Sequence, residues 1–186
     1  MPLPGFAIGE DGWAAGIPRI LSPNFDARPE GTAITLIVIH GISLPPGRFG
    51  TGCIEQLFTN ALDLTADPCF ESLRDLRVSS HFLIERSGTT VQFVSCAMRA
   101  WHAGASEFGG RPRCNDYALG IELEGTDDQR YEDAQYESLN ALLLSLVAAY
   151  PVCAVVGHSE IAPGRKTDPG PYFDWTRLSA DLRLRA

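Results

Sequence analysis

The sequence has no long hydrophobic run and no basic leader segment. Its longest apolar stretch, Ala141–Tyr150, is too short to cross a lipid bilayer, which requires about 20 residues. The first twenty residues lack the positively charged start of a secretory signal peptide, and Glu10 and Asp11 interrupt them. We therefore expect a cytoplasmic protein that makes no membrane contact.

Positive charge and paired cysteines are also scarce. The formal net charge is −8 and the pI is about 4.9, which argues against binding to nucleic-acid phosphates, anionic membranes or cell-wall polymers. The five cysteines are scattered and form no Cys-x-x-Cys pair, so neither a disulfide framework nor a structural zinc knuckle is indicated. We expect a monomer in a reducing compartment, with a small soluble molecule as its partner.

The regular patterns in the 186 residues indicate one domain. Two nearly continuous apolar runs, Ile34–Ile39 and Val152–Val156, predict strands that are buried on both faces. Tyr117–Glu124 alternates between apolar and polar or small residues and predicts a further strand. Asp133–Tyr150 has apolar residues at helical spacing and predicts the longest helix.

Shorter patterns complete the expected fold. Ser80–Glu85 and Thr89–Val94 flank a Ser-Gly turn and predict a hairpin. Three further helices are expected at Ile54–Asn60, at Pro68–Leu76 and, capped by Asp174, at Trp175–Leu184. Glycine and proline are frequent at residues 1–32, Gly41–Gly52 and Trp101–Cys114, which predict an irregular N-terminal arm and two loops. The fold class is therefore α/β: residues 1–186 form a single domain with a mixed central sheet flanked by helices, and residues 1–32 pack on it.

Two histidines follow the two apolar runs. His40 ends the run Ile34–Ile39, His158 comes shortly after Val152–Val156, and Asp168 lies in the next loop. Imidazole nitrogen and carboxylate oxygen are both ligands of zinc, and three protein ligands leave a position for water, as in catalytic zinc sites. The alternatives are hydrogen-bonded core residues for the histidines and a turn residue for the aspartate.

Two further residues could perform chemistry beside such a metal. Glu122 lies between Ile121 and Leu123 in the middle of a strand, where a carboxylate is unfavourable unless it is paired or functional. It is a candidate general base for an attacking water molecule. Lys166, two residues before Asp168, is either an exposed charge or an ammonium group that stabilises an oxyanion.

The other candidate residues have competing interpretations. His81 lies between residues that are expected to be buried, which favours a core histidine. Trp101 and His102, in a glycine-rich loop, either line a substrate groove or anchor the loop. For Glu124 we expect solvent contact or a salt bridge.

The sequence also offers residues for two rival nucleophilic sites. A Ser-His-Asp arrangement could use Ser43 or Ser159, but the sequence contains no Gly-x-Ser-x-Gly elbow. A Cys-His arrangement could use Cys114, but no predicted helix start lies there to lower the pKa of its thiol.

The sequence segments that carry these residues resemble a known family. They are Val38–Gly47 (VIHGISLPPG), Arg77–Ile84 (RVSSHFLI), Arg99–Gly104 (RAWHAG), Cys114–Thr126 (CNDYALGIELEGT), and Gly157 and His158 followed by Lys166–Pro171 (KTDPGP). In this order they are similar to segments of the zinc-dependent N-acetylmuramoyl-L-alanine amidases. The resemblance extends from about Gly12 to Leu182, nearly the whole chain.

The resemblance implies the fold of the amidase and peptidoglycan-recognition-protein family and a definite set of site residues. By family pattern these are the zinc ligands His40, His158 and Asp168, the catalytic residues Glu122 and Lys166, and the substrate contacts Arg77, Trp101 and Arg113. The cofactor would be Zn²⁺. Gly41 stands where family members have an asparagine that contacts the substrate.

The resemblance also implies a substrate. The most similar family members cleave the amide between anhydro-N-acetylmuramic acid and L-alanine of muropeptides during cytoplasmic peptidoglycan recycling. Their substrates also act as inducer signals for β-lactamase expression in some bacteria. The alternatives are a non-catalytic muropeptide-binding or sensing module of the peptidoglycan-recognition type, and an amidase that acts on the polymeric wall.

Overall fold

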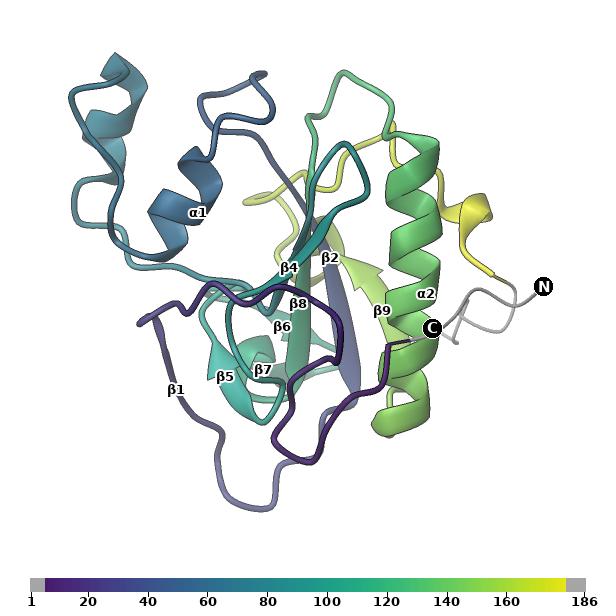
Figure 1. The fold of residues 1–186 in the computed structure, drawn as a ribbon. Coiled ribbons are helices and arrows are strands. Elements are labelled where there is room, and N and C mark those ends of the chain that lie inside the picture. Colours follow the sequence, from purple (N-terminus) through teal and green to yellow (C-terminus); the bar gives the residue numbers. More distant parts are fainter. Residues whose placement is uncertain (1–5, 180–186) are drawn as a thin grey trace.

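A five-stranded sheet lies at the centre of the computed structural model, which describes residues 6–179 (Figure 1). Its strands are β2 (Leu36–Ile42), β3 (Phe82–Ile84), β4 (Thr90–Gln92), β8 (Ala118–Glu124) and β9 (Ala154–Gly157). They lie in the order β4-β3-β8-β2-β9, and only β4 is antiparallel to its neighbour. The predicted α/β fold, a single domain with a mixed sheet flanked by helices, is confirmed.

The remaining elements surround this sheet. The helices are α1 (Cys53–Phe58), α2 (Asp133–Ala149) and α3 (His158–Ile161), with short 3-10 helices η1 (Pro68–Leu73), η2 (Cys114–Asp116) and η3 (Trp175–Arg177). Two small antiparallel pairs join β1 (Phe25–Ala27) to β5 (Met98–Ala100) and β6 (Glu107–Phe108) to β7 (Arg111–Pro112).

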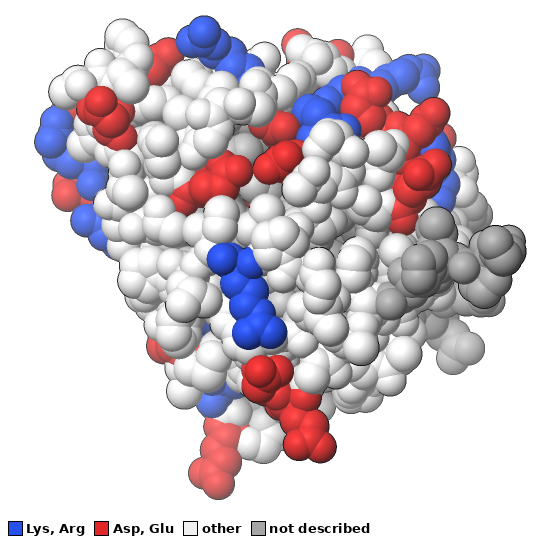
Figure 2. Space-filling model, viewed as in Figure 1, with Lys and Arg blue, Asp and Glu red and all other residues white. Residues whose placement is uncertain are grey.

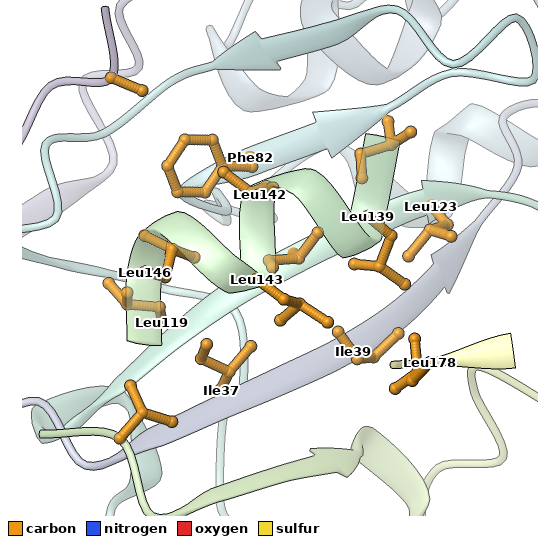
Figure 3. Packing of buried hydrophobic residues seen from close by; sticks show 14 of the residues in the cluster. Ile37, Ile39, Phe82, Leu119, Leu123, Leu139, Leu142, Leu143, Leu146 and Leu178 are labelled. Carbon is orange, nitrogen blue, oxygen red and sulfur yellow. The ribbon is translucent and has the colours of Figure 1, made fainter. Parts of the chain in front are cut away.

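Helix α2 covers one face of the sheet (Figures 1 and 3). Its side chains Leu139, Leu142, Leu143 and Leu146 are fully buried, and each contributes about 2 kcal/mol of burial free energy. The side chains that they meet from β2, β3 and β8 include Ile37, Ile39, Phe82, Leu119, Ile121 and Leu123. Because side chains alternate along a strand, the odd-numbered residues of β2 and β8 face α2 and the even-numbered residues face away.

The opposite face of the sheet carries two smaller apolar clusters. One joins Leu83 of β3 to Phe58 of α1 and Phe70 of η1. The other joins Val38 of β2 to Ile161 of α3 and to neighbouring residues. The even-numbered polar residues of the central strands share this face with the two clusters, so any site that they form lies on the side of the sheet away from α2.

The central strands differ from their predicted ranges at several ends, and two of these differences concern candidate site residues. Strand β2 continues through His40 and Gly41 to Ile42, because its pairing with β8 persists as far as Glu124. His40 therefore lies within the strand rather than at its end. His158 is the first residue of the short helix α3, where the sequence predicted a loop.

The peripheral predictions are corrected in four places. The helix expected from Pro68 is a 3-10 helix that ends at Leu73, although Pro68 opens it as expected. The loop Trp101–Cys114 contains the β6–β7 hairpin, and the irregular N-terminal arm contains β1. The terminal helix is only the turn η3, capped by Asp174 as predicted, while residues 180–184 lie outside the described part of the chain.

The surface agrees with the composition. On the face shown in Figure 2, acidic and basic side chains are interspersed and form no continuous basic surface. Within residues 6–179, none of the helices combines the length and the apolar character that crossing a bilayer requires.

Gln92 attaches the N-terminal arm to the sheet. Its side chain is completely buried, and its amide oxygen accepts a hydrogen bond from the Ala14 backbone N–H at 2.8 Å. Its amide nitrogen donates to the carbonyl oxygens of Gly12 (2.9 Å) and Val94 (3.1 Å). One buried glutamine therefore pairs backbone groups of the N-terminal arm and of the segment that follows β4.

We predict that Gln92→Leu lowers the free energy of unfolding by about 3 kcal/mol, because buried backbone groups of Ala14 and Val94 lose their partner. Chemical denaturation followed by circular dichroism measures this change. The exposed Gln56→Leu variant is the matched control and should change stability by less than about 0.5 kcal/mol. Equal stabilities of the two variants would contradict this role of Gln92.

Candidate active site

The register of the central strands brings two predicted site residues together. His40 of β2 is directly paired with Glu122 of β8 in the parallel ladder. Both residues are even-numbered and point away from α2, and they are 1% and 8% exposed. Their side chains approach to 3.9 Å between His40 Nδ1 and Glu122 Oε1.

The third strand and the loop after it supply the other two candidate ligands. Ile39 pairs with Gly157, the last residue of β9, so the chain presents His158 next to His40. The loop after α3 then returns, and the Ser159 backbone N–H donates to the Asp168 carbonyl oxygen at 2.9 Å. This bond fixes the backbone of Asp168 beside the start of α3.

Three ligand atoms converge at this point. His40 Nδ1 lies 2.9 Å from His158 Nδ1 and 3.2 Å from Asp168 Oδ2, and His158 Nδ1 lies 3.0 Å from Asp168 Oδ2. Ligands at zinc-type bond lengths in tetrahedral geometry are separated by about 3.3 Å. The spacing therefore suits a small divalent cation, and this is the group of metal-binding side chains found among the described residues.

The outer nitrogens of both histidines have partners that orient the rings. His158 Nε2 lies 3.2 Å from the carbonyl oxygen of Ala103, which can only accept, so an Nε2–H group of His158 donates to it. His40 Nε2 lies 2.9 Å from His102 Nδ1. Metal-binding histidines usually form a hydrogen bond through their second nitrogen. Here the two partners, His102 and Ala103, are consecutive residues of one loop.

The protonation states also favour metal binding. Burial lowers the pKa of His40 to about 4 and that of His102 well below its usual range, so both rings are neutral at pH 7. Burial opposes ionisation of Asp168, but its hydrogen bonds with His158 and His40 outweigh this effect and hold the pKa of its carboxyl well below the usual value. A neutral His40 and an ionised Asp168 are the forms in which these two side chains can bind a metal ion.

Glu122 differs from Asp168 in its electrostatic environment. Burial, reinforced by the negative charge of Asp168 and opposed by Lys166, raises the pKa of the Glu122 carboxyl well above its usual range. A carboxyl group with a raised pKa can both accept and donate a proton near neutral pH. Asp168 is therefore suited to bind a metal ion, and Glu122 is suited to transfer protons.

The site opens into a cavity of about 260 Å³. Its lining includes the three candidate ligands together with Glu122, Lys166, Trp101 and His102. It also includes the apolar side chains of Leu57, Phe58, Leu73 and Leu76. The exposed Lys166 lies at its rim. The cavity thus combines proton-transfer groups with an apolar wall.

Most of the predicted site residues meet in this cavity, but two do not. Arg77 is exposed and donates to the carbonyl oxygens of Arg74 and Leu76. The Arg113 side chain is 68% exposed and pairs with Asp116 at 3.1 Å. Neither arginine is among the residues that line the cavity.

The alternatives raised for other residues are also resolved. Glu124 does not face solvent, and it forms no salt bridge with another residue of the described range 6–179. It is 3% exposed and accepts from the backbone N–H groups of Gly50 and Arg86. His81 is a core residue whose Nδ1 accepts from the Gly120 backbone N–H at 3.0 Å. Cys114 is buried against the hydroxyl of Tyr117 at 3.3 Å.

The pairing of His102 with His40 was not predicted. In the sequence His102 is a histidine in a glycine-rich loop, and only its position after Trp101 suggested a place at the site. Its ring lies over Gly120, where a Cβ atom would come within 2.5 Å of His102 Cγ. Gly120 therefore leaves the space that the His102 ring fills. This could not be read from the sequence, because it becomes visible only when β8 and the loop are placed side by side.

Together the fold and the site define a candidate metal-assisted hydrolase, with a proton-transfer carboxyl group next to three metal-binding side chains. Residues 30–171 match the family model described as N-acetylmuramoyl-L-alanine amidase. The chain belongs to this amidase family.

The individual relatives agree with this assignment. The chain is 53% identical over 171 residues to 1,6-anhydro-N-acetylmuramyl-L-alanine amidase AmpD of Escherichia coli, a match that covers 91% of this chain and 93% of the relative. AmpD of Haemophilus influenzae is 47% identical over 177 residues, covering 94% and 96%.

Solved structures resemble the chain in the same way. The crystal structure of a selenomethionine derivative of AmpD has a TM-score of 0.90 at 50% identity and covers 93% of this chain and 98% of its own. A complex of AmiD from E. coli with the substrate anhydro-N-acetylmuramic acid-L-Ala-D-gamma-Glu-L-Lys has a TM-score of 0.60 at 30% identity, covering 86% of this chain and 62% of that one.

We predict that His102→Ala weakens Zn²⁺ binding about tenfold, because His40 loses the acceptor that orients its ring. His102→Asn should retain most of the affinity, since an amide oxygen can take the place of Nδ1. Competition with a chromophoric chelator measures both values, and circular dichroism checks that each variant is folded. Equal affinities of the Ala variant and the wild type would exclude this role of His102.

Proposed function

We propose that the protein is a zinc-dependent amidase that cleaves the amide bond between anhydro-N-acetylmuramic acid and L-alanine in soluble muropeptides. It acts as a monomer in the cytoplasm, where it takes part in peptidoglycan recycling. The observation that supports this most is the convergence of His40, His158 and Asp168 beside Glu122, in a chain about half identical to AmpD amidases over nearly its whole length.

The chain's own residues account for the reaction as follows. His40, His158 and Asp168 would hold the zinc ion, which when bound would supply Lewis acidity to the scissile carbonyl and to water. Glu122 takes a proton from the attacking water and passes it to the leaving amine of L-alanine. The ammonium group of Lys166, at the cavity rim, stabilises the negative charge that develops on the carbonyl oxygen.

The substrate contacts are assigned by chemistry and position. Trp101 lines the cavity and offers an indole face to the sugar. Arg77 and Arg113 carry exposed guanidinium groups, which suit the carboxylates of a stem peptide that extends beyond the cavity. The AmiD complex, with an anhydro-muropeptide bound to a related fold, supports this class of substrate.

We predict that the purified protein releases free stem peptide from an anhydro-muropeptide and that a zinc chelator stops the reaction, because the amide is activated only when the three ligands hold their metal. Re-addition of Zn²⁺ should restore it. Mass spectrometry of the products, run in parallel on a muropeptide that differs only in lacking the anhydro ring, measures both activity and ring selectivity. Binding without cleavage would instead indicate a sensing module, and activity on intact sacculi would indicate a wall amidase.

We predict that Glu122→Gln retains bound zinc but lowers kcat about 10³-fold, because the amide cannot accept the proton of water. Zinc content by atomic absorption and turnover by product analysis are measured on the same preparation. Glu124→Gln is the matched control: this neighbouring buried glutamate accepts only backbone N–H groups, which an amide oxygen can also do, so turnover should persist. Full turnover in Glu122→Gln would remove this residue from the mechanism.

A further inference from the structure

Tyr131 lies outside the cavity lining but touches the segments that carry two of the metal-binding residues. It precedes Glu132, the N-cap of α2, and is 5% exposed. Its hydroxyl donates a hydrogen bond of 2.9 Å to the carbonyl oxygen of Pro169, the residue after Asp168. Burial raises the pKa of Tyr131, so the hydroxyl keeps its proton and remains a donor.

The ring of Tyr131 is held in place from the side of α2. Its centroid lies 6.4 Å from that of Tyr136 and 5.5 Å from that of Phe173, both in edge-to-face geometry. Tyr131 and Tyr136 occupy the positions just before the helix cap and at the fourth helical residue, where an apolar pair fixes the angle at which the chain enters a helix. The start of α2 therefore determines where the Tyr131 hydroxyl lies.

Two glycines make room for this tyrosine. A Cβ atom on Gly41 would lie 2.3 Å from Tyr131 Oη, while its next nearest neighbour, Pro169 Cα, is at an ordinary 3.4 Å. A Cβ atom on Gly125 would lie 2.3 Å from Tyr131 Cε1, a ring atom. A Cβ atom at residue 41 would therefore overlap the Tyr131 hydroxyl, whereas a Cβ atom at residue 125 would overlap the Tyr131 ring.

The Tyr131 hydroxyl contacts residues that are adjacent to two candidate metal ligands. Gly41 directly follows His40 in β2, and Pro169 directly follows Asp168. The Tyr131 hydroxyl thus lies between the backbone segments that carry these two candidate ligands. On the other side of the loop, Ser159 holds the carbonyl of Asp168, so Tyr131 provides the second attachment of this segment.

We propose that Tyr131 is a positioning residue of the metal centre, whose hydroxyl holds the Asp168–Pro169 segment against β2, and that this hydroxyl occupies the place that a Cβ atom of residue 41 would take. The first half rests on the proposed zinc-dependent function. The second half concerns packing alone and holds with or without metal.

The first experiment compares Tyr131→Phe with wild type for Zn²⁺ affinity by chelator competition on metal-free protein. The variant keeps the ring and loses only the hydrogen bond to Pro169, so binding should weaken about tenfold, as for other residues that orient metal ligands. Tyr136→Phe is the matched control. Its hydroxyl accepts from the Asp174 backbone N–H at 2.7 Å in the same aromatic cluster, and its zinc affinity should stay within twofold of wild type.

The second experiment tests the coupling between residues 41 and 131 by thermal denaturation of the metal-free protein. Gly41→Ala alone should lower the melting temperature by several degrees, because the new methyl group overlaps the hydroxyl. The same substitution in the Tyr131→Phe background should cause little further loss. Gly125→Ala should be equally damaging in both backgrounds, because the ring atom that it meets remains.

The outcomes separate the two proposals. Equal zinc affinities of wild type and Tyr131→Phe would overturn the positioning role while leaving the zinc amidase intact. Equal losses from Gly41→Ala in the two backgrounds would overturn the packing argument. Wild-type protein that binds no zinc would overturn the proposed function and the positioning role with it, but the melting temperatures would still decide why residue 41 is glycine.

Discussion

The parallel pairing of β2 with β8 and β9 is the constraint on which the rest of the site depends. This register sets His40 beside Glu122 and brings His158 alongside His40. A slip of one residue would turn the side chain of His40 towards α2 and would expose Ile39 to the cavity. The leucines of α2 that bury Ile37 and Ile39 therefore also determine which residues face the cavity (Figure 3).

A second layer of contacts holds the candidate ligands in their orientations. His102 and Ala103 bind the outer nitrogens of His40 and His158, so one loop controls both rings. Arg165, from the segment that leads to Asp168, donates to the same Ala103 carbonyl at 2.8 Å. The carbonyl of Ala103 thus joins the two segments around the site, and displacement of the loop would disturb a histidine and the aspartate segment together.

The sequence predicted the sheet and the main helix because apolar runs and helical spacing are local patterns. It also placed His40, His158 and Asp168 as candidate ligands, since residues near the ends of neighbouring strands meet at one edge of a sheet. The contact between His40 and His102 and the burial of Glu124 could not be predicted from local patterns. They depend on side chains that are distant in sequence and on backbone N–H groups whose direction the sequence does not specify.

Contacts with residues distant in sequence also determine the role of Gly41, which follows His40, so the sequence alone does not show why a glycine stands there. Gly41 lines the active-site cavity and also a second, more polar hollow beside it, which Ser43, Asp127 and Arg165 help to line. The two hollows share Gly41, Lys166 and Asp168. A side chain at residue 41 would therefore stand between them as well as displace Tyr131. The absence of a side chain at residue 41 thus leaves room for the tyrosine that is proposed to hold the Asp168 segment, at the point where the two hollows meet.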